Sequence, residues 1–283
     1  MPRQLAAQYA RLKATPPNQL ASEAVAVLLS EMALRARRIL ADTERVQLFS
    51  PTTGKPYFSF RGAEQTRPIN ADLYAEDELD FEQLLAAFLN GFAESRPEEI
   101  VRATYSLAFS VFAANDVNSI GRKASATFFE NLIGHIVARC IGFPPRNKVR
   151  TPETGADLPT DYVFDPGERS RKLHLPIKIS TRERVVQAWV HQLVLARIFG
   201  DGVYRGVLVV GTETKRDTRT GEVIEICIPG QLQLFQARVT EMTRVYYLDP
   251  PAPYLELAHA FPRVEVKPFG EALAELPHLL AER

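Results

Sequence analysis

An acid and a lysine flank a predicted β-hairpin near the middle of the chain, and together they could support hydrolysis of a phosphodiester bond. Asp161 lies in a short predicted strand, and Lys178 follows the turn residues Asp165-Pro166-Gly167 on the return strand. If the chain turns there, Asp161 pairs near residue 177 or 178, because paired strands lie ~5 Å apart. The carboxylate could hold Mg²⁺, which favours oxygen ligands and polarises a phosphate, and the lysine could orient the attacking water.

The alternation around Lys178 assigns it to one face of its strand. Four apolar residues share the opposite face: Leu173, Leu175, Ile177 and Ile179. Lys178 therefore projects with His174 on the other face. A lysine at a strand end can also reach solvent along its stem, or form a structural ion pair with Asp161, so the hairpin alone leaves these alternatives open.

Three charged residues follow the lysine at the start of a predicted helix over 180–199. Arg182, Glu183 and Arg184 occupy its first turn, and Ser180 with Glu183 has the form of a capping box. Arginine can donate two hydrogen bonds to guanine, and a carboxylate can accept one from cytosine, so the triplet suits adjacent C·G pairs. An exposed, charged first turn is the simpler interpretation of the same residues.

These elements together resemble type II restriction endonucleases of the PD-(D/E)xK superfamily. The resemblance rests on Asp161-Tyr162, on Leu175-Pro176-Ile177-Lys178, and on the triplet that begins four residues after Lys178. It is most marked with the subgroup that recognises CCGG, or CC and GG flanking a spacer. The resemblance implies that Asp161 is a metal ligand, Lys178 the catalytic lysine, and Arg182, Glu183 and Arg184 the DNA-binding residues.

The same resemblance implies two further residues in the active site. Glu130, within Phe129-Glu130 on a predicted helix over 124–141, is similar to a helix-borne acid of the family and would be a second metal ligand. The family acid two residues before the lysine is replaced by Pro176. In the subgroup that acid moves onto the following helix, to a position that is His191 here, followed by Gln192. His191 is therefore a candidate catalytic residue, and a polar helix position is its alternative.

The resemblance also carries expectations about cofactors and partners. It implies Mg²⁺ as the cofactor, double-stranded DNA with a roughly palindromic site as the substrate, and a homodimer that places one active site on each strand. A DNA methyltransferase that protects host DNA would complete the restriction–modification system. Glu213 is a further possible acid or DNA-facing residue, and Lys215 and Arg216 could contact phosphates or lie in a solvated turn.

The periodicity of the remaining chain predicts an α/β fold, and the resemblance implies a restriction-endonuclease-like mixed central sheet flanked by helices. Residues 1–115 form a mostly helical N-terminal region for dimerisation or for clamping DNA, and residues 116–283 form the endonuclease core. Predicted helices cover 22–40, 80–94, 97–114, 124–141, 180–199 and 230–239. Predicted strands cover 160–165, 173–179, 205–212, 222–228 and 245–248, and residues 48–74 are expected to be a loop or small hairpin.

Composition narrows the function classes. The 283 residues carry 34 Lys plus Arg and 34 Asp plus Glu, so any basic DNA-binding surface must be local. The chain contains no apolar run long enough for a membrane span and no apolar leader, and Cys140 and Cys227 form no spaced cluster, which favours a reducing cytoplasm. A structure-selective repair or recombination nuclease and a non-catalytic DNA-binding module remain the alternatives to a restriction endonuclease.

Overall fold

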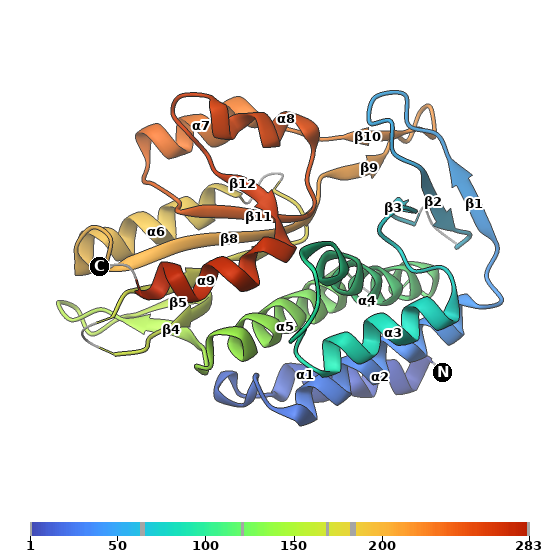
Figure 1. Cartoon of the computed structure of the whole chain (residues 1–283), viewed down its shortest axis with the longest axis horizontal. Coiled ribbons are helices and arrows are strands. Elements are labelled where there is room, and N and C mark those ends of the chain that lie inside the picture. Colours follow the sequence, from blue (N-terminus) through green and yellow to red (C-terminus); the bar gives the residue numbers. More distant parts are fainter. Residues whose placement is uncertain (1, 63–65, 120–121, 168–169, 182–184, 282–283) are drawn as a thin grey trace. The chain divides into compact units, whose positions relative to one another are not determined.

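The computed structural model describes residues 2–62, 66–119, 122–167, 170–181 and 185–281 (Figure 1). Contacts between residues divide the chain into two compact units. The first comprises Met1–Thr15, Ser22–His135 and Glu213–Ile226, and the second comprises Pro16–Ala21, Ile136–Thr212 and Cys227–Arg283. The division falls at residue 135, inside a continuous helix, rather than at the boundary of 115 expected from the sequence.

The first unit consists mainly of helices. They are α1 (Pro2–Ala14), α2 (Glu23–Leu40), α3 (Glu78–Leu89), α4 (Pro97–Val117) and the first part of α5 (Arg122–Ile141). α4 is central, because α2 and α3 both pack against it and nearly every residue from Ile100 to Asn115 is buried. The predicted helices over 22–40, 80–94 and 97–114 are confirmed, whereas the sequence pattern missed α1.

Two small β structures complete the first unit. β1 (Arg45–Leu48), β2 (Tyr57–Phe60) and β3 (Ile69–Asn70) form an antiparallel sheet in the region expected to be a loop or small hairpin. β9 (Thr214–Arg216) and β10 (Val223–Glu225) form an antiparallel hairpin. The hairpin joins this unit because the Val223 N–H donates to the Phe49 carbonyl at 2.8 Å.

The second unit is built on a mixed sheet. Its described strands are β4 (Arg146–Arg150), β5 (Asp157–Phe164), β6 (Lys172–Leu175), β7 (Ile177–Lys178), β8 (Tyr204–Thr212), β11 (Arg244–Asp249) and β12 (Val266–Pro268). Their order is β12-β11-β8-β6-β5-β4, with β7 also paired to β8. The pairs from β4 to β6 are antiparallel and the others parallel.

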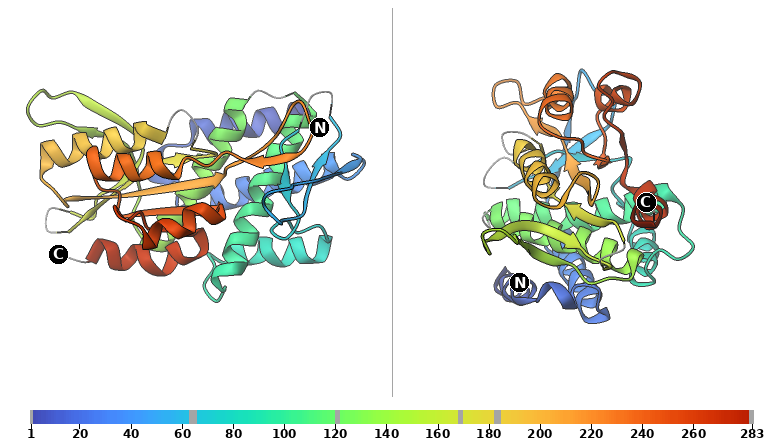
Figure 2. Two further views of the ribbon diagram at one scale, coloured as in Figure 1. Left: turned by 90° about the horizontal axis from the view of Figure 1, so that it is seen from above. Right: turned by 90° about the vertical axis from the view of Figure 1, so that its left-hand side faces the viewer.

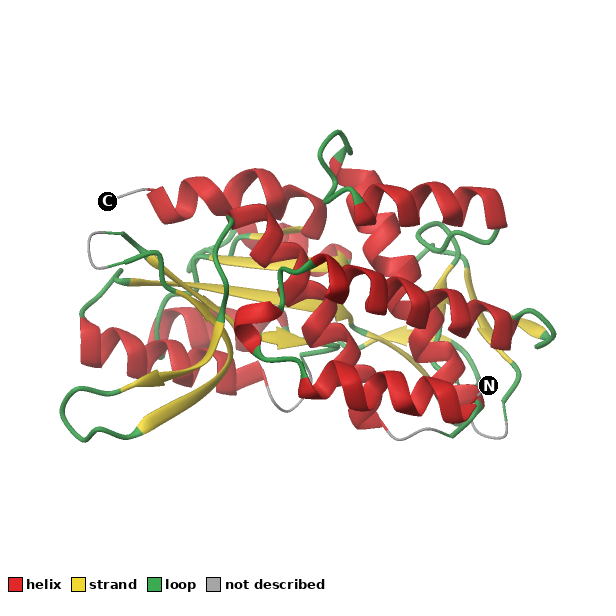
Figure 3. Ribbon diagram, turned by 90° about the horizontal axis from the view of Figure 1, so that it is seen from below, coloured by secondary structure: helices red, strands yellow, loops and turns green. Residues whose placement is uncertain are grey.

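The central strand β8 explains the apolar run at 207–210. Side chains alternate along it, with Leu208 and Val210 on one face and Val207 and Val209 on the other, and all four are buried. A strand that is covered on both faces needs apolar residues at consecutive positions. Figure 3 shows the strands passing between helices, so the predicted α/β class is confirmed.

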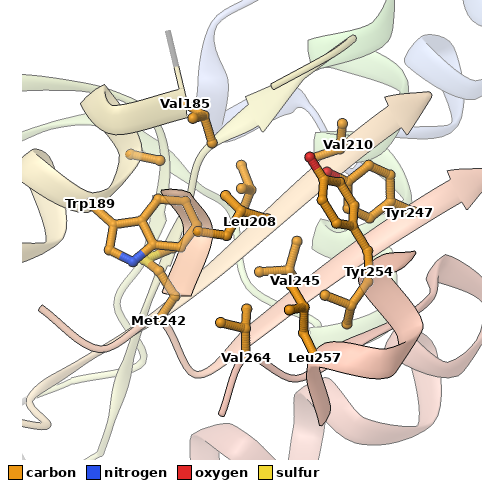
Figure 4. Packing of buried hydrophobic residues seen from close by; sticks show 13 residues of the cluster. Val185, Trp189, Leu208, Val210, Met242, Val245, Tyr247, Tyr254, Leu257 and Val264 are labelled. Carbon is orange, nitrogen blue, oxygen red and sulfur yellow. The ribbon is translucent and has the colours of Figure 1, made fainter. Parts of the chain in front are cut away.

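Helices cover both faces of this sheet (Figures 1 and 2). α6 (Val185–Phe199), α7 (Pro229–Arg238) and α8 (Ala252–Leu255) lie on one face. There Trp189 and Tyr254 pack with Leu208 and Val245 in one hydrophobic cluster (Figure 4). α9 (Ala272–Ala281) lies on the other face, where the Tyr246 hydroxyl donates to Glu275 Oε2 at 2.7 Å.

The sequence pattern missed several elements that this sheet depends on. β4, β12, α8 and α9 were not predicted; β12 and α8 are only three and four residues long, and β4 and β12 are the edge strands of the sheet. Within the described ranges, none of the helices combines the length and the apolar character needed to span a bilayer.

Candidate active site

Asp161 and Lys178 form a close ion pair in the second unit. Lys178 Nζ lies 2.6 Å from Asp161 Oδ2, and the backbone N–H of Ile177 donates to the same oxygen at 2.7 Å. Both contacts fall on Oδ2, so among the described residues Oδ1 remains open to a further ligand. The side chains are 24% and 19% exposed, which leaves the pair within reach of solvent.

The register of the hairpin accounts for this pair. Tyr162 pairs with Leu175, so Asp161 stands opposite Pro176, one residue short of the partner predicted from the turn. Proline has no N–H and cannot continue the ladder between β5 and β6. The next N–H, that of Ile177, is therefore free to donate to the Asp161 carboxylate instead of to a backbone carbonyl.

The position of Lys178 is fixed from the other side by β8. Lys178 pairs with Val210 and Ile177 with Val209, in the same parallel register as His174 with Gly206. Alternation places His174 and Lys178 on one face of the sheet, as predicted, and α6 covers that face. Lys178 is therefore held beside Asp161 by strand pairing with β8 on one side and by the hydrogen bond from Ile177 to the Asp161 carboxylate on the other.

His174 is a second polar residue on this face, and it is completely buried. Its Nδ1 lies 3.0 Å from Gln192 Oε1, and Gln192 Nε2 donates to the Tyr204 carbonyl at 2.8 Å. Burial lowers the pKa of His174 to about 4, against the raising effect of the Gln192 hydrogen bond. The imidazole is therefore neutral at neutral pH.

His191 belongs to α6, and its ring lies beside that of His174. The two ring centroids are 6.4 Å apart, and the ring planes are tilted by 45°. It is half-buried, and burial lowers its pKa below the ordinary value of 6.5. The negative charge of Asp161 opposes that shift, and the positive charge of Lys178 adds to it. His191 therefore lies within the electrostatic influence of the ion pair.

Gly206 makes room for this arrangement. A Cβ atom at this position would lie 2.8 Å from Gln192 Oε1 and 2.7 Å from Met242 Sδ. Such contacts are far shorter than ordinary van der Waals distances, so only glycine lets Gln192 approach the sheet and hold His174. The sequence pattern predicts no role for His174 or Gly206, although the alternation places His174 on the same face as Lys178.

The other candidate acids of the active site, Glu130 and Glu213, belong to the first unit. Glu130 is half-buried on α5 in the first unit, next to the fully buried Phe129. Glu213 belongs to the same unit and is only 1% exposed, which does not fit a side chain that faces DNA. Arg182, Glu183 and Arg184 lie outside the described residues, so the DNA-binding role of the triplet stays a prediction.

The donor set around Asp161 is small. The described residues contain no group of three or more His, Cys, Asp or Glu side chains that could hold a metal ion. Mg²⁺ does not need such a group, because it commonly binds through one or two carboxylates and completes its shell with water and phosphate. The open Oδ1 of Asp161 beside a positively charged lysine therefore fits a cation that is shared with a phosphodiester.

Comparison with solved structures decides the fold. The chain is similar to the crystal structure of the type IIP restriction endonuclease Kpn2I, with a TM-score of 0.77 and 24% sequence identity over 88% of this chain and 89% of that chain. The chain has a restriction-endonuclease fold. A restriction endonuclease PspGI–substrate DNA complex matches over 95% of each chain, with 12% identity and a TM-score of 0.38, too low to support an argument. No protein-family model and no curated protein matches the chain.

Within this restriction-endonuclease fold, the Asp161–Lys178 pair lies where β5 and β6 separate and β7 continues along β8. The ion pair, the two histidines and Gln192 come from two antiparallel strands, one short parallel strand and one helix. The arrangement can hold a divalent cation, orient a water molecule and offset the charge of a phosphate.

Proposed function

We propose that the chain is a Mg²⁺-dependent type II restriction endonuclease that hydrolyses duplex DNA at a short, GC-rich, roughly palindromic site. The observation that carries the proposal is the contact of 2.6 Å between Lys178 Nζ and Asp161 Oδ2. It occurs in a fold similar to that of the type IIP restriction endonuclease Kpn2I. An acid and a lysine at this distance match the chemistry of metal-assisted phosphodiester hydrolysis.

In this proposal each residue has a defined task. Asp161 would hold the cation, while its Oδ2 accepts from Lys178 and from the Ile177 N–H. Lys178 orients the attacking water and offsets negative charge on the phosphate. Glu130 supplies a second carboxylate, and His191 assists the water as a neutral imidazole. The bound cation polarises the phosphate and lowers the pKa of its bound water.

Recognition is assigned to the segment before α6. Arg182 and Arg184 would donate to guanine and Glu183 would accept from cytosine, which favours a site that contains CC and GG. A palindromic site has two equivalent half-sites, so a two-fold homodimer would present one triplet and one active site to each strand. The proposal includes a cognate methyltransferase that protects host DNA and a cytoplasmic location, where both enzymes would meet that DNA.

The test is digestion of plasmid DNA by the purified chain with Mg²⁺, followed by sequencing of the ends. We expect discrete fragments with 5′-phosphate and 3′-hydroxyl ends. Lys178→Ala should lower the cleavage rate by about 10²- to 10⁴-fold, the typical worth of a group that positions a reacting proton, while DNA binding persists.

Lys172 provides the matched control for that variant. It pairs with Asp165 at 2.7 Å, and both side chains are 19% exposed, so an ion pair of similar length and exposure lies at the turn end of the β5–β6 hairpin. Lys172→Ala should therefore leave cleavage close to the wild-type rate. A smear of products or equal losses in both variants would contradict the proposal, and faster cleavage of branched DNA would favour a structure-selective nuclease.

A further inference from the structure

The hydrogen bonds of His174 fix which of its nitrogens carries the proton. Gln192 Nε2 donates to the Tyr204 carbonyl, which can only accept, so the amide of Gln192 has a defined orientation. Its Oε1 must then accept from His174 Nδ1, at 3.0 Å. A neutral imidazole carries one proton, so Nδ1 is the donor and Nε2 presents a bare lone pair.

That lone pair has no hydrogen-bond partner among the described residues. His174 Nε2 is completely buried, and polar atoms in protein interiors nearly always find a partner. The nearest aromatic ring is that of His191, with a centroid separation of 6.4 Å. Asp161 and Lys178 exert electrostatic effects on both rings, so the two histidines share the charged surroundings of the ion pair.

The separation of the rings discriminates between a shared metal ion and a shared water. A metal–nitrogen bond of about 2.1 Å beyond a ring radius of roughly 1.2 Å puts the centres of two rings about 5.3 Å apart at a tetrahedral metal, and about 6.5 Å apart only when the two nitrogens lie on opposite sides of it. Hydrogen bonds of about 2.9 Å place each ring centre roughly 4 Å from a water oxygen. The observed 6.4 Å then corresponds to an angle near tetrahedral at that oxygen, which suits one water.

We propose that one buried water joins His174 Nε2 to the ring of His191, and that His174 is a positioning residue that fixes which nitrogen of His191 is bare. The water donates to Nε2 and directs its second hydrogen toward the Asp161 carboxylate, so it accepts from an N–H of His191. The outer nitrogen of His191 then presents its lone pair. Any role of this His191 lone pair toward a cation or an attacking water rests on the proposed function, whereas the water bridge between the two rings does not.

The direct test is long-range ¹H–¹⁵N NMR of the full chain without DNA or metal. Only five histidines are present, so their ring nitrogens can be assigned by substitution. We expect His174 with protonated Nδ1 and bare Nε2, and His191 as a single tautomer. A protonated Nε2 on His174 would overturn the assignment. A crystal structure of the wild-type protein without water density between the rings would overturn the bridge.

Two variants separate the bridge from simple packing. His174→Gln keeps an acceptor near the position of Nε2, and His174→Asn keeps a donor toward Gln192 but loses that acceptor. We expect His191 to remain one tautomer in His174→Gln and to become a mixture in His174→Asn, with both variants folded by circular dichroism. An unchanged His191 spectrum in His174→Asn would refute a positioning role. If neither variant folds, the wild-type NMR spectrum still tests the tautomer of His174, and the wild-type crystal structure still tests the bridging water.

Cleavage kinetics distinguish this inference from the proposed function. If the chain cleaves DNA, His174→Asn should lower kcat about tenfold with little change in KM, and His174→Gln should recover part of that loss. A loss of kcat that is equal in both variants would contradict the bridge. If the wild-type chain cleaves no DNA although the NMR result is as expected, the proposed function fails and the bridge stands.

Discussion

Burial of a neutral imidazole makes the stability of the second unit depend on pH, and His174→Asn tests that dependence. His174 is completely buried, and burial lowers its pKa to about 4 from an ordinary value of 6.5. Above pH 6.5 both the folded and the unfolded chain carry a neutral ring. Between pH 6.5 and about 4 the unfolded chain binds a proton that the folded chain does not bind, so stability falls as the pH falls.

The size of this loss follows from the shift. One pKa unit corresponds to about 1.4 kcal/mol, so His174 alone lowers the free energy of unfolding by about 2 kcal/mol at pH ~5 relative to neutral pH. His191 changes stability in the same direction, because burial also lowers its pKa. Asparagine does not titrate, so His174→Asn should remove only the His174 contribution.

The assay is urea unfolding of both proteins at about pH 7.5 and about pH 5. The wild-type protein should lose about 2 kcal/mol more between the two conditions than His174→Asn loses. The comparison cancels any constant cost of the smaller side chain. His278→Asn, at an exposed position on α9, controls for removal of a histidine as such. Equal pH dependence in wild type and His174→Asn would refute the buried neutral imidazole.

Three further predictions concern the elements around the site. Gly206→Ala should destabilise the protein by about 1–3 kcal/mol in urea unfolding, because its Cβ would overlap neighbouring side chains, whereas Gly230→Ala, with no atom within 4 Å, should not. Trp189→Ala should lower the free energy of unfolding by about 3–5 kcal/mol, because core packing is lost. Val190 is exposed, so Val190→Ala should lower it by less than about 0.5 kcal/mol. Asp161→Asn should weaken binding of Mn²⁺ about tenfold or more by calorimetry without DNA, because the carboxylate charge is lost; unchanged affinity would exclude Asp161 as the ligand.

Local pattern was sufficient for the elements that carry the ion pair. The alternation at 173–179 predicted a strand with Lys178 and His174 on one face, and the turn residues at 165–167 predicted that this strand returns beside the one that carries Asp161. Side-chain alternation is a property of every strand, so these predictions needed no distant contact. The exact partner was missed by one residue, because register also depends on Pro176, whose effect appears only when the second strand is in place.

Contacts between residues that are far apart in the sequence were harder to predict from the sequence alone. In the sequence Gln192 is only the neighbour of His191, but in the structure its amide links His174 to the Tyr204 carbonyl. The need for glycine at 206 arises from the same approach of helix to sheet. Likewise, residues 213–226 join the first unit through the contact between Val223 and Phe49. The local sequence of neither segment predicts this contact.

The sequence by itself determined the α/β class, the long helices and the face on which Lys178 projects. It could do so because the spacing of apolar residues within each segment shows which of its faces is buried. It also singled out an acid and a lysine as chemically suited to phosphodiester hydrolysis. Only the tertiary structure decided that Lys178 Nζ and Asp161 Oδ2 meet at 2.6 Å, and that His174 is buried neutral beside His191. The physical reason is that hydrogen bonds and desolvation depend on distances between elements, and those distances are set by packing and strand register rather than by any one segment.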